Sequence, residues 1–420
     1  MQRNSSVDIR LFTMMTAYTT IGIVLVMFGQ ASECLPIVDQ TTSAAVRSNN
    51  QFALDLLKTL SASNGENVFF SPLSISAAVA MTSLGARGNT LDEIDNTFHF
   101  NDVKKTSSDP MALHETFQNI MSLFQEGNSN YSLSIANRLF SQEGFEILTK
   151  FLEDTDKYYK ATVQQLKFGT GQAEGIINQW VAKQTHDKIK ELFQPGSLSA
   201  DTVLALVNAI YFKGNWKSQF SKESTTDMDF YMTSDEKKMV KMMSIKKTFP
   251  YAEDSDLKAQ VLELPYAGDD LSMIVILPEL GGISKLTSQM TVEKFEHLMN
   301  QLNKRKVNVK LPKFKLETEY SLKETLQQLG IKSLFDNGAD LSGISNEKLK
   351  VSKVIHKAFI ETDEEGTEAA AATGITFQRY SALLPKETEP EFIGDHPFLF
   401  AIVDKRLSNQ VLFMGTLVQP

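Results

Sequence analysis

The sequence predicts an α+β fold with large β-sheets, because helical patterns come first and strand patterns follow. Apolar residues recur at helical spacing between residues 50 and 60. Nearly continuous apolar runs at 203–212, 271–278, 398–403 and 411–414 indicate strands that are buried on both faces. Helices early and strands late along one chain are typical of α+β or mixed folds with large sheets.

The composition excludes several classes of protein. The chain has 420 residues, of which 42% are hydrophobic and 22% charged, a balance typical of folded globular proteins. Its net charge of -9 argues against a nucleic-acid partner and against docking on anionic lipid. The 1 cysteine, Cys34, excludes a disulfide within the chain and a thiolate metal site.

The sequence contains none of the enzyme motifs for which we searched. The sequence contains no G-x-G-x-x-G, Walker A, H-E-x-x-H or G-x-S-x-G pattern. The 6 histidines are scattered, and none lies at metal-ligand spacing from another. We therefore expect no metal, no cofactor and no catalytic residue.

The amino terminus has the layout of a secretory signal peptide. Two arginines precede the apolar stretch 11–28, and small residues follow it. We expect residues 1–31 to be removed, with cleavage after Ala31 or as late as Cys34. The alternative is a membrane anchor, although four threonines thin the stretch. The expected mature protein is secreted and extracellular, lies outside the membrane and forms one domain over 35–420.

A secreted chain would also carry a glycosylation site at Asn130. Asn130-Tyr131-Ser132 is an N-glycosylation triplet in a polar turn. The sequence therefore predicts a glycoprotein.

Two further helices have clear boundary signals. Ser71 is the expected N-cap and Pro72 the first residue of a helix that runs through Leu84 and ends at Gly85. A third helix is expected over 174–193, where a proline and a glycine stop it.

The strand patterns differ in how they expose their faces. Residues 307–311 alternate between apolar and polar, so one face of that strand is expected to be wet. The basic run 304–306 before it is expected to form an exposed turn. Asn409 lies between the last two apolar runs and indicates a hairpin.

The segment 364–374 departs from everything around it. It follows the strand-like run 354–360, and about thirty residues separate Gly366 from the next apolar run, which is too long for an idle connection in a compact domain. With a period of two, one face of the segment is small and then apolar, as in a strand that enters a sheet. An alanine-rich helix capped by Thr367 fits the composition equally well, and both remain open at this point.

Several motifs together resemble the serpins, a family of serine protease inhibitors, over essentially the whole expected mature chain. The motifs agree in order and spacing; they are Asn67–Ile75, Val207–Trp216, Leu264–Tyr266, Leu311–Phe314, Glu364–Thr373, His396–Phe398 and Leu412–Gly415. The resemblance implies a serpin fold, with helices packed around three β-sheets and an exposed reactive-centre loop over about 364–395. It also implies a suicide substrate: a protease cleaves the loop, is trapped as an acyl-enzyme, and the loop inserts into a sheet.

The resemblance assigns roles to particular residues. The expected reactive bond is Tyr380–Ser381, for a chymotrypsin-like protease, with Arg379 as the alternative for a trypsin-like one. The mobile hinge is expected at Gly366, Thr367, Glu368, Ala369, Ala370, Ala371, Ala372 and Thr373. The shutter, a polar cluster beneath the sheet that must open, is expected at Ser71, Ser74, Asn208 and His356. The breach, where insertion starts, is expected at Trp216, Lys313 and Glu364, the last two as an ion pair.

The hinge decides between two kinds of serpin. Members that act as carriers tend to have bulky or charged hinge residues, and none occurs here on the inserting face. We therefore expect an inhibitor that forms a covalent complex with an extracellular serine protease. A non-inhibitory carrier is the alternative. The inhibitor is expected to be a monomer that can polymerise by loop–sheet insertion.

Overall fold

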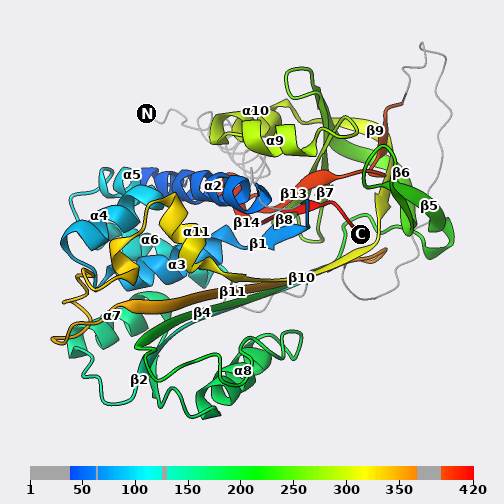
Figure 1. The fold of residues 1–420 in the computed structure, drawn as a ribbon. Helices are drawn as coiled ribbons and strands as arrows, with labels where there is room; N and C mark the ends of the chain where they lie inside the picture. The colour runs from blue at the N-terminus through cyan, green and yellow to red at the C-terminus, as the bar shows by residue number, and fades with distance from the viewer. Residues whose placement is uncertain (1–37, 63–64, 125–129, 367–388) are drawn as a thin grey trace, which may run out of the picture. The chain divides into compact units, whose positions relative to one another are not determined.

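The fold combines two β-sheets with helices, as seen in a computed structural model (Figure 1) that describes residues 38–62, 65–124, 130–366 and 389–420. The helices are α2 (Gln40–Ser61), α3 (Pro72–Ser83), α4 (Gly88–Thr97), α5 (Phe100–Lys104), α6 (Ala112–Ser122), α7 (Thr149–Tyr159), α8 (Gln172–Gln184), α9 (Ile283–Gln289), α10 (Val292–Gln301) and α11 (Leu322–Leu329). The strands are β1 (Val68–Phe70), β2 (Tyr131–Gln142), β3 (Val163–Leu166), β4 (Leu204–Gly214), β5 (Thr226–Tyr231), β6 (Lys237–Asp254), β7 (Ala259–Pro265), β8 (Leu271–Pro278), β9 (Asn303–Pro312), β10 (Phe314–Ser321), β11 (Val351–Thr362), β12 (Glu391–Ile393), β13 (Phe398–Asp404) and β14 (Gln410–Leu417). Residues 39–420 form one compact unit.

Local sequence signals explain the best-predicted elements. In α3, the Ser71 side chain accepts a hydrogen bond from the Ser74 amide and Pro72 occupies the first turn, as expected. Strand β8 has the predicted bounds, and β13 and β14 pair as the predicted antiparallel hairpin. Asn409 in the turn between them has a φ of 66°, a left-handed conformation that asparagine tolerates.

Three expectations about elements are wrong. Helix α2 begins at Gln40, ten residues before the expected start. Helix α8 ends at Gln184, because His186 and Asp187 adopt left-handed backbone conformations and the chain folds back. The basic run 304–306 lies within β9, where pairing with β6 extends the strand instead of forming a turn.

The nine-stranded sheet follows the order β1-β14-β13-β8-β7-β6-β9-β12, with β5 also paired to β6. The long strand β6 joins its two halves: residues 237–251 pair with β5 and β9, and 251–254 pair with β7. Two of the three sheets that the resemblance implied are therefore joined in this nine-stranded sheet. The predicted fold class is confirmed.

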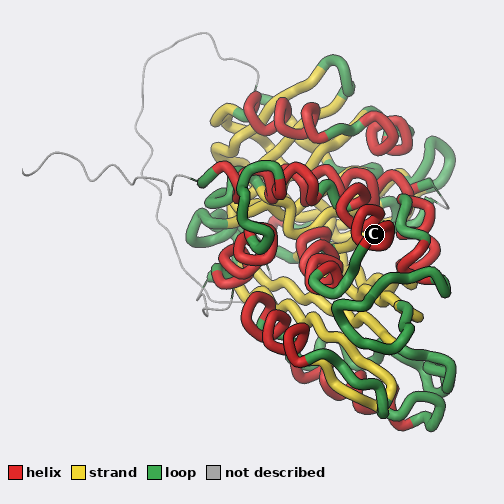
Figure 2. Tube along the Cα trace, turned by 90° about the vertical axis from the view of Figure 1, so that its left-hand side faces the viewer, coloured by secondary structure: helices red, strands yellow, loops and turns green. Residues whose placement is uncertain are grey.

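The five-stranded sheet has the order β10-β11-β4-β2-β3 and is covered on both faces. Helices α3 and α11 lie on one face and α8 on the other (Figures 1 and 2). The main core packs on the α3 side, and a second apolar cluster fills the space beneath α8. Every residue of β4 except Lys213 is buried, as the apolar run predicted. Among the described residues, no helix is long and apolar enough to cross a membrane.

Candidate functional site

The site is the end of the five-stranded sheet from which the segment 364–374 departs. Strand β11 leads into that segment, and its neighbour β4 runs parallel to it. Their pairing ends at Phe359 and Tyr211, although β11 continues to Thr362 and β4 to Gly214. The two strands therefore separate at the end where the segment begins.

A turn over residues 363–366 is fixed to the chain that follows β4. The backbone carbonyl of Glu365 accepts a hydrogen bond from the Trp216 amide at 2.9 Å. The Trp216 indole donates to the Asp363 carbonyl, also at 2.9 Å. The Phe220 amide donates to the Glu364 carbonyl at 2.9 Å. Backbone bonds thus attach the start of the segment beside the end of β4.

Gly366 completes this turn in a place that admits no side chain. Its φ is +108°, a conformation that residues with a Cβ rarely adopt. A Cβ there would lie 2.3 Å from the Gly214 carbonyl oxygen and 2.5 Å from the Trp216 amide nitrogen. The glycine permits both the turn and the close approach of the two backbones.

The ion pair that the sequence analysis expected between Lys313 and Glu364 is present. The Lys313 ammonium donates to a Glu364 carboxylate oxygen at 2.7 Å, and the Thr225 hydroxyl donates to the other, also at 2.7 Å. The Glu364 side chain is 6% exposed and that of Lys313 is 38% exposed. Burial alone would raise the pKa of Glu364, but the hydrogen bonds from Lys313 and Thr225 outweigh it and lower the pKa below its ordinary value.

An aromatic stack supports the third breach residue. The rings of Trp216 and Tyr266 lie parallel, with their centroids 4.5 Å apart. Phe220 meets Trp216 at an angle with a centroid separation of 6.4 Å. Trp216 is therefore held by ring packing as well as by its hydrogen bond to Asp363.

The four shutter residues are brought together beneath the middle of the sheet. All four are buried. The Ser71 amide donates to His356 Nε2 at 3.1 Å, and the other ring nitrogen, Nδ1, contacts the Asn208 side-chain oxygen. The Asn208 amide nitrogen in turn donates to the Ser74 hydroxyl. The cluster connects α3 to the neighbouring strands β4 and β11.

The hydrogen bonds fix the protonation of His356. Because Nε2 accepts from a backbone N–H, the ring proton is on Nδ1 and donates to Asn208. Complete burial lowers the pKa of His356 to about 3. The imidazole is therefore neutral at physiological pH. If Nε2 were also protonated, its N–H and the Ser71 amide N–H would be two donors facing each other.

Two polar residues of the site were not recognised in the sequence. Asn137 on β2 is the register partner of Asn208 and accepts a hydrogen bond from its side chain. Thr225 holds the second oxygen of Glu364. An asparagine inside the alternating run 131–142 was the available signal for the first, and the sequence offers none for the second.

The remaining predicted residues are Asn130, which lies beside the chain that follows β4, and residues outside the described part of the chain. The hinge residues 367–373 and the reactive-bond residues 379–381 fall outside the described residues. The carbonyl of Asn130 accepts a hydrogen bond from Asn215 at 3.2 Å, and its side chain lies beside Gly268. Within the described ranges, no group of three metal-ligating side chains could hold an ion.

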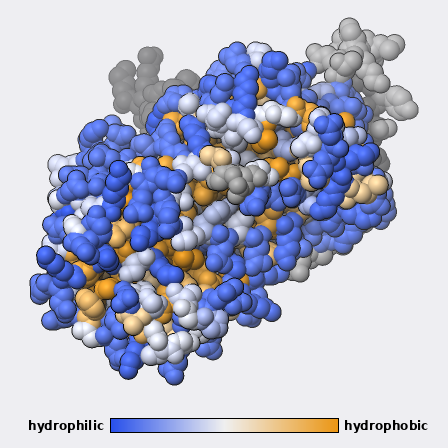
Figure 3. All heavy atoms as spheres, viewed as in Figure 1, coloured by the Kyte–Doolittle hydropathy of each residue, from blue (hydrophilic) through white to orange (hydrophobic). Residues whose placement is uncertain are grey.

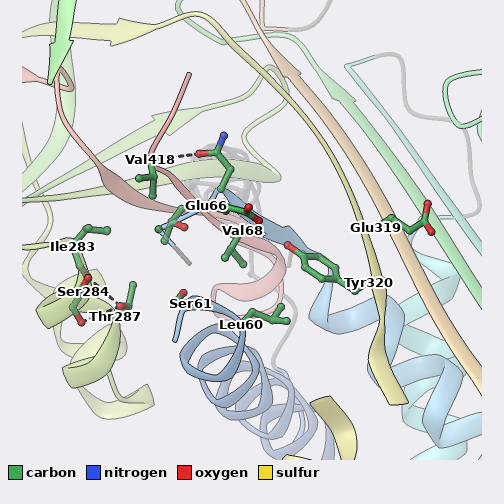
Figure 4. A pocket seen from close by; sticks show the side chains of 13 residues that line it. Leu60, Ser61, Glu66, Val68, Ile283, Ser284, Thr287, Glu319, Tyr320 and Val418 are labelled. Atoms are coloured by element: carbon green, nitrogen blue, oxygen red, sulfur yellow. Dashed lines mark hydrogen bonds between the residues drawn. The ribbon is translucent and has the colours of Figure 1, made fainter. Parts of the chain in front are cut away.

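A separate cavity of about 340 Å³ lies at the end of α2 (Figure 4). Its lining combines Leu60 and Ser61 with β1, α9 and Tyr320 of β10. The cavity contains none of the predicted site residues.

Comparison with known proteins identifies the family. The model of the family described as serpin (serine protease inhibitor) matches residues 47–420. The chain belongs to the serpins. It is 43% identical to the leukocyte elastase inhibitor of Homo sapiens over 396 residues, which cover 91% of this chain and 100% of that protein. It is 40% identical to serpin B4 of Homo sapiens, over 89% of this chain and 98% of that protein.

Solved serpin structures show the same fold. Human thyroxine-binding globulin, solved in complex with its ligand, matches with a TM-score of 0.82 and 30% identity, over 90% of this chain and 99% of that chain. The prediction of a serine protease inhibitor that is not itself an enzyme is confirmed by the family and by the inhibitors among its relatives.

The prediction of a secreted, extracellular serpin is wrong. The leukocyte elastase inhibitors and serpins B that match this chain are intracellular serpins without signal peptides. The prediction depended on residues 1–34, which precede the family match. That prediction was based only on composition, an apolar stretch that follows two arginines, and threonines make this stretch less apolar. The glycoprotein expectation depended on secretion and has no support either.

Proposed function

We propose that this serpin inhibits a chymotrypsin-like serine protease, which attacks the Tyr380–Ser381 bond. The protease becomes trapped when the hinge residues 366–373 enter the five-stranded sheet between β4 and β11. The observation that carries the proposal is the pairing of these two strands. They are parallel neighbours, and their pairing stops at the end where the hinge begins.

Strand direction makes insertion favourable. A strand that turns back at Gly366 runs antiparallel to both β11 and β4. It replaces one parallel ladder, with 8 partner pairs, by two antiparallel ladders. An added strand of about a dozen residues makes on the order of ten new hydrogen bonds, each worth about 1 kcal/mol net. That gain is comparable with the stability of a whole domain, about 5–15 kcal/mol, so the uncleaved form must be kinetically trapped.

The contacts of the site suit the roles given to its residues. The breach residues Trp216, Lys313 and Glu364 hold the first turn of the hinge against the end of β4. The shutter residues connect β4 to β11 through the Asn208–His356 contact. Entry of a strand between β4 and β11 must break that contact, so the shutter opposes insertion until the breach has opened.

The protease is arrested because its active site is pulled out of shape. The acylated protease stays attached to the inserting segment and is drawn away with it. Loss of a single oxyanion-hole donor slows acyl transfer by about a hundredfold or more. Hydrolysis of the acyl-enzyme is then slower than insertion, and the complex persists.

Tyr380 sets the class of protease in this proposal. A tyrosine before the scissile bond suits an apolar specificity pocket, whereas a cut after Arg379 suits a trypsin-like pocket. The register depends on family spacing counted from Gly366.

The test is incubation of the full chain with chymotrypsin and, separately, with trypsin. We expect chymotrypsin to give a covalent complex that survives boiling in detergent, and mass spectrometry to find a released fragment that begins at Ser381. A Tyr380→Ala variant should lose this reaction, while an Arg379→Ala variant keeps it. Cleaved product without a covalent band would contradict the proposal and favour a non-inhibitory serpin.

A further inference from the structure

Two aromatic rings close the boundary between β4 and β11 at the end where the hinge begins. Tyr211 of β4 and Phe359 of β11 are register partners and form the last pair of the parallel ladder. Their ring centroids lie 5.9 Å apart, with an angle of 49° between the ring planes. Beyond them, β11 continues to Thr362 and β4 to Gly214 without pairing with each other. We call Tyr211 and Phe359 the aromatic pair.

The aromatic pair lies on the face of the sheet opposite the shutter. Residues an odd number apart on a strand point to opposite faces, so Tyr211 and Phe359 point away from the side of Asn208 and His356. Both rings belong to the apolar cluster beneath α8, and each residue is 4% exposed. The rings are thus set apart from the surface, where hydrophilic residues dominate the face of the molecule shown in Figure 3. The boundary between the strands is closed on both faces of the sheet.

A lysine lies over each ring of the aromatic pair. Lys188 Nζ is 5.9 Å from the centroid of the Tyr211 ring, and Lys315 Nζ is 5.0 Å from the centroid of the Phe359 ring. Lys188 belongs to the segment after α8, and Lys315 belongs to β10, the other neighbour of β11. Both distances are within the range of cation–π attraction. Each ring is therefore held by a cation as well as by the other ring.

A strand that enters the sheet meets the aromatic pair before it meets the shutter. The bridge between Asp363 and Gly366 is antiparallel. In the proposed insertion, a strand that continues this register brings Ala370 opposite Phe359, and it reaches His356 only later. One inserted strand moves β4 and β11 from one strand spacing of about 4.8 Å to two. Insertion must therefore break the ring contact, and it does so before it breaks the contacts of the shutter.

We propose that Tyr211 and Phe359 are positioning residues for the inhibitory reaction, because their ring contact is the first barrier after the breach and limits the rate of insertion. This inference rests on the proposed function. The contact stabilises the closed sheet and is absent once the strands have parted, so its removal lowers the barrier. The aromatic pair thus helps to keep the uncleaved form kinetically trapped, and it also slows insertion after cleavage.

The test measures how fast the full-length, uncleaved chain takes up a synthetic peptide of residues 367–378, which supplies the inserting strand without a protease. Native mass spectrometry follows the uptake, and a rise in melting temperature confirms that the peptide has entered the sheet. The variants are Phe359→Leu, Tyr211→Leu and the double variant, because leucine keeps the position apolar and removes the ring contact. Each single variant tests the pair by itself, so the failure of one to fold leaves the other as the test.

Phe140→Leu is the matched control. Phe140 is buried in the same apolar cluster, and its ring centroid lies 5.7 Å from that of Trp180. This contact joins β2 to α8 and does not cross the boundary between β4 and β11. The control therefore removes a ring contact from the cluster and leaves the aromatic pair intact. The reaction of the wild-type chain with chymotrypsin is run in parallel.

We expect each single variant to take up the peptide about threefold to tenfold faster than the wild type, which corresponds to the loss of one aromatic contact. The double variant should be at most about twice as fast as the faster single variant, because both substitutions remove the same contact. Phe140→Leu should take up the peptide at the wild-type rate.

Three results would overturn the role of the aromatic pair alone: single variants no faster than the wild type, an equal acceleration in Phe140→Leu, or fully additive effects in the double variant. The same conclusion would follow if the wild-type chain formed the covalent complex with chymotrypsin but took up no peptide. A wild-type chain that forms no covalent complex would instead overturn the proposed function, and this inference with it.

Discussion

Gly366 and Gly214 are in direct backbone contact at the point where β4 and β11 separate. A Cβ on Gly366 would lie 2.3 Å from the Gly214 carbonyl oxygen. Gly366, the first residue of the expected hinge, is therefore already held against the end of β4 and attached to β11. A strand that enters between β4 and β11 therefore starts from a position that these contacts already hold.

Replacing Gly366 by alanine should loosen this starting position. The left-handed backbone costs a residue with a Cβ about 1–2 kcal/mol, and the contacts with backbone atoms of Gly214 and Trp216 add to that cost. Because these atoms belong to the backbone, they cannot move aside as a side chain could. We expect Gly366→Ala to lower the urea midpoint of the uncleaved form by an amount that corresponds to at least about 2 kcal/mol.

Gly144→Ala is the matched control for this prediction. Gly144 also has a positive φ, of +93°, but nothing lies within 4 Å of the position that a Cβ would take there. It carries the backbone strain without the collision. Equal losses in both variants would show that the contact with Gly214 contributes nothing.

Reversing the charge of Lys313 should destabilise the breach. Lys313→Glu leaves the buried Glu364 carboxylate with a like charge beside it and with Thr225 as its side-chain partner. An unpaired buried charge can cost several kcal/mol, but Lys313 is partly exposed and solvent screens its contribution. We expect a loss of about 1–2 kcal/mol, with faster polymerisation on mild heating because the hinge enters the sheet more easily.

The neutral variant Glu364→Gln provides the control for the ion pair. In that background, Lys313→Glu should cost much less than in the wild type. A double-mutant cycle on thermal midpoints measures the difference. If the two substitutions were additive, the observed 2.7 Å contact would contribute nothing to stability.

Local signals in the sequence were enough for parts of the fold. A serine cap followed by proline defines the start of α3, and an apolar run bounded by a proline defines β8. The second half of the predicted helix 174–193 failed for a reason that periodicity cannot reveal. Asn178 accepts hydrogen bonds from the amides of Leu192 and Phe193, both at 2.9 Å, and these amides are therefore unavailable to a helix.

The site, too, could be predicted only in part, because local patterns do not reveal contacts between residues that are far apart in the sequence. The shutter and breach residues came from a family resemblance, and the side-chain contacts bring each group together. Asn137 and Thr225 were missed because their partners, Asn208 and Glu364, are 71 and 139 residues away in the sequence. Such pairs depend on strand register and on chain crossings that no local pattern contains.

Acid should weaken the shutter through His356. The ring has a pKa of about 3 in the folded protein and about 6.5 when unfolded. Between these values the unfolded state holds one more proton, so folding stability is complete above pH 6.5 and falls as the pH drops toward 3. His114, with a pKa of about 4, adds a second proton in the upper part of this window. One proton corresponds to about 1.4 kcal/mol per pH unit.

The variant His356→Gln should therefore show a shallower pH dependence of its urea midpoint between pH 6.5 and 4.5. Its stability at pH 7.5 falls as well, because the contact with Asn208 changes, but the slope reports the titration alone. His297→Gln, at an exposed position, is the matched histidine control. An unchanged slope in His356→Gln would mean that this ring gains its proton equally in both states.

Thr367→Arg should convert the inhibitor into a substrate. Thr367 follows Gly366 in the sequence, and in the proposed insertion it is on the face of the hinge that enters the core of the sheet. The free-energy cost of burying an unpaired arginine there exceeds the gain from the first hydrogen-bonded pairs of the new ladder. Cleavage after Tyr380 should continue at the wild-type rate, while hydrolysis of the acyl-enzyme outpaces insertion and no covalent complex accumulates.

The melting temperatures of cleaved samples separate this mechanism from a simple loss of binding. Cleaved wild-type protein with an inserted strand should melt on the order of 10 °C or more above the intact form, as expected for about 10 kcal/mol of added ladder energy. Cleaved Thr367→Arg should melt near the intact form, and Glu368→Arg, on the opposite face of the hinge, should lose less of the gain. If cleaved and intact wild-type protein melted together, no stored energy would exist to trap a protease, and the insertion mechanism would have to be abandoned.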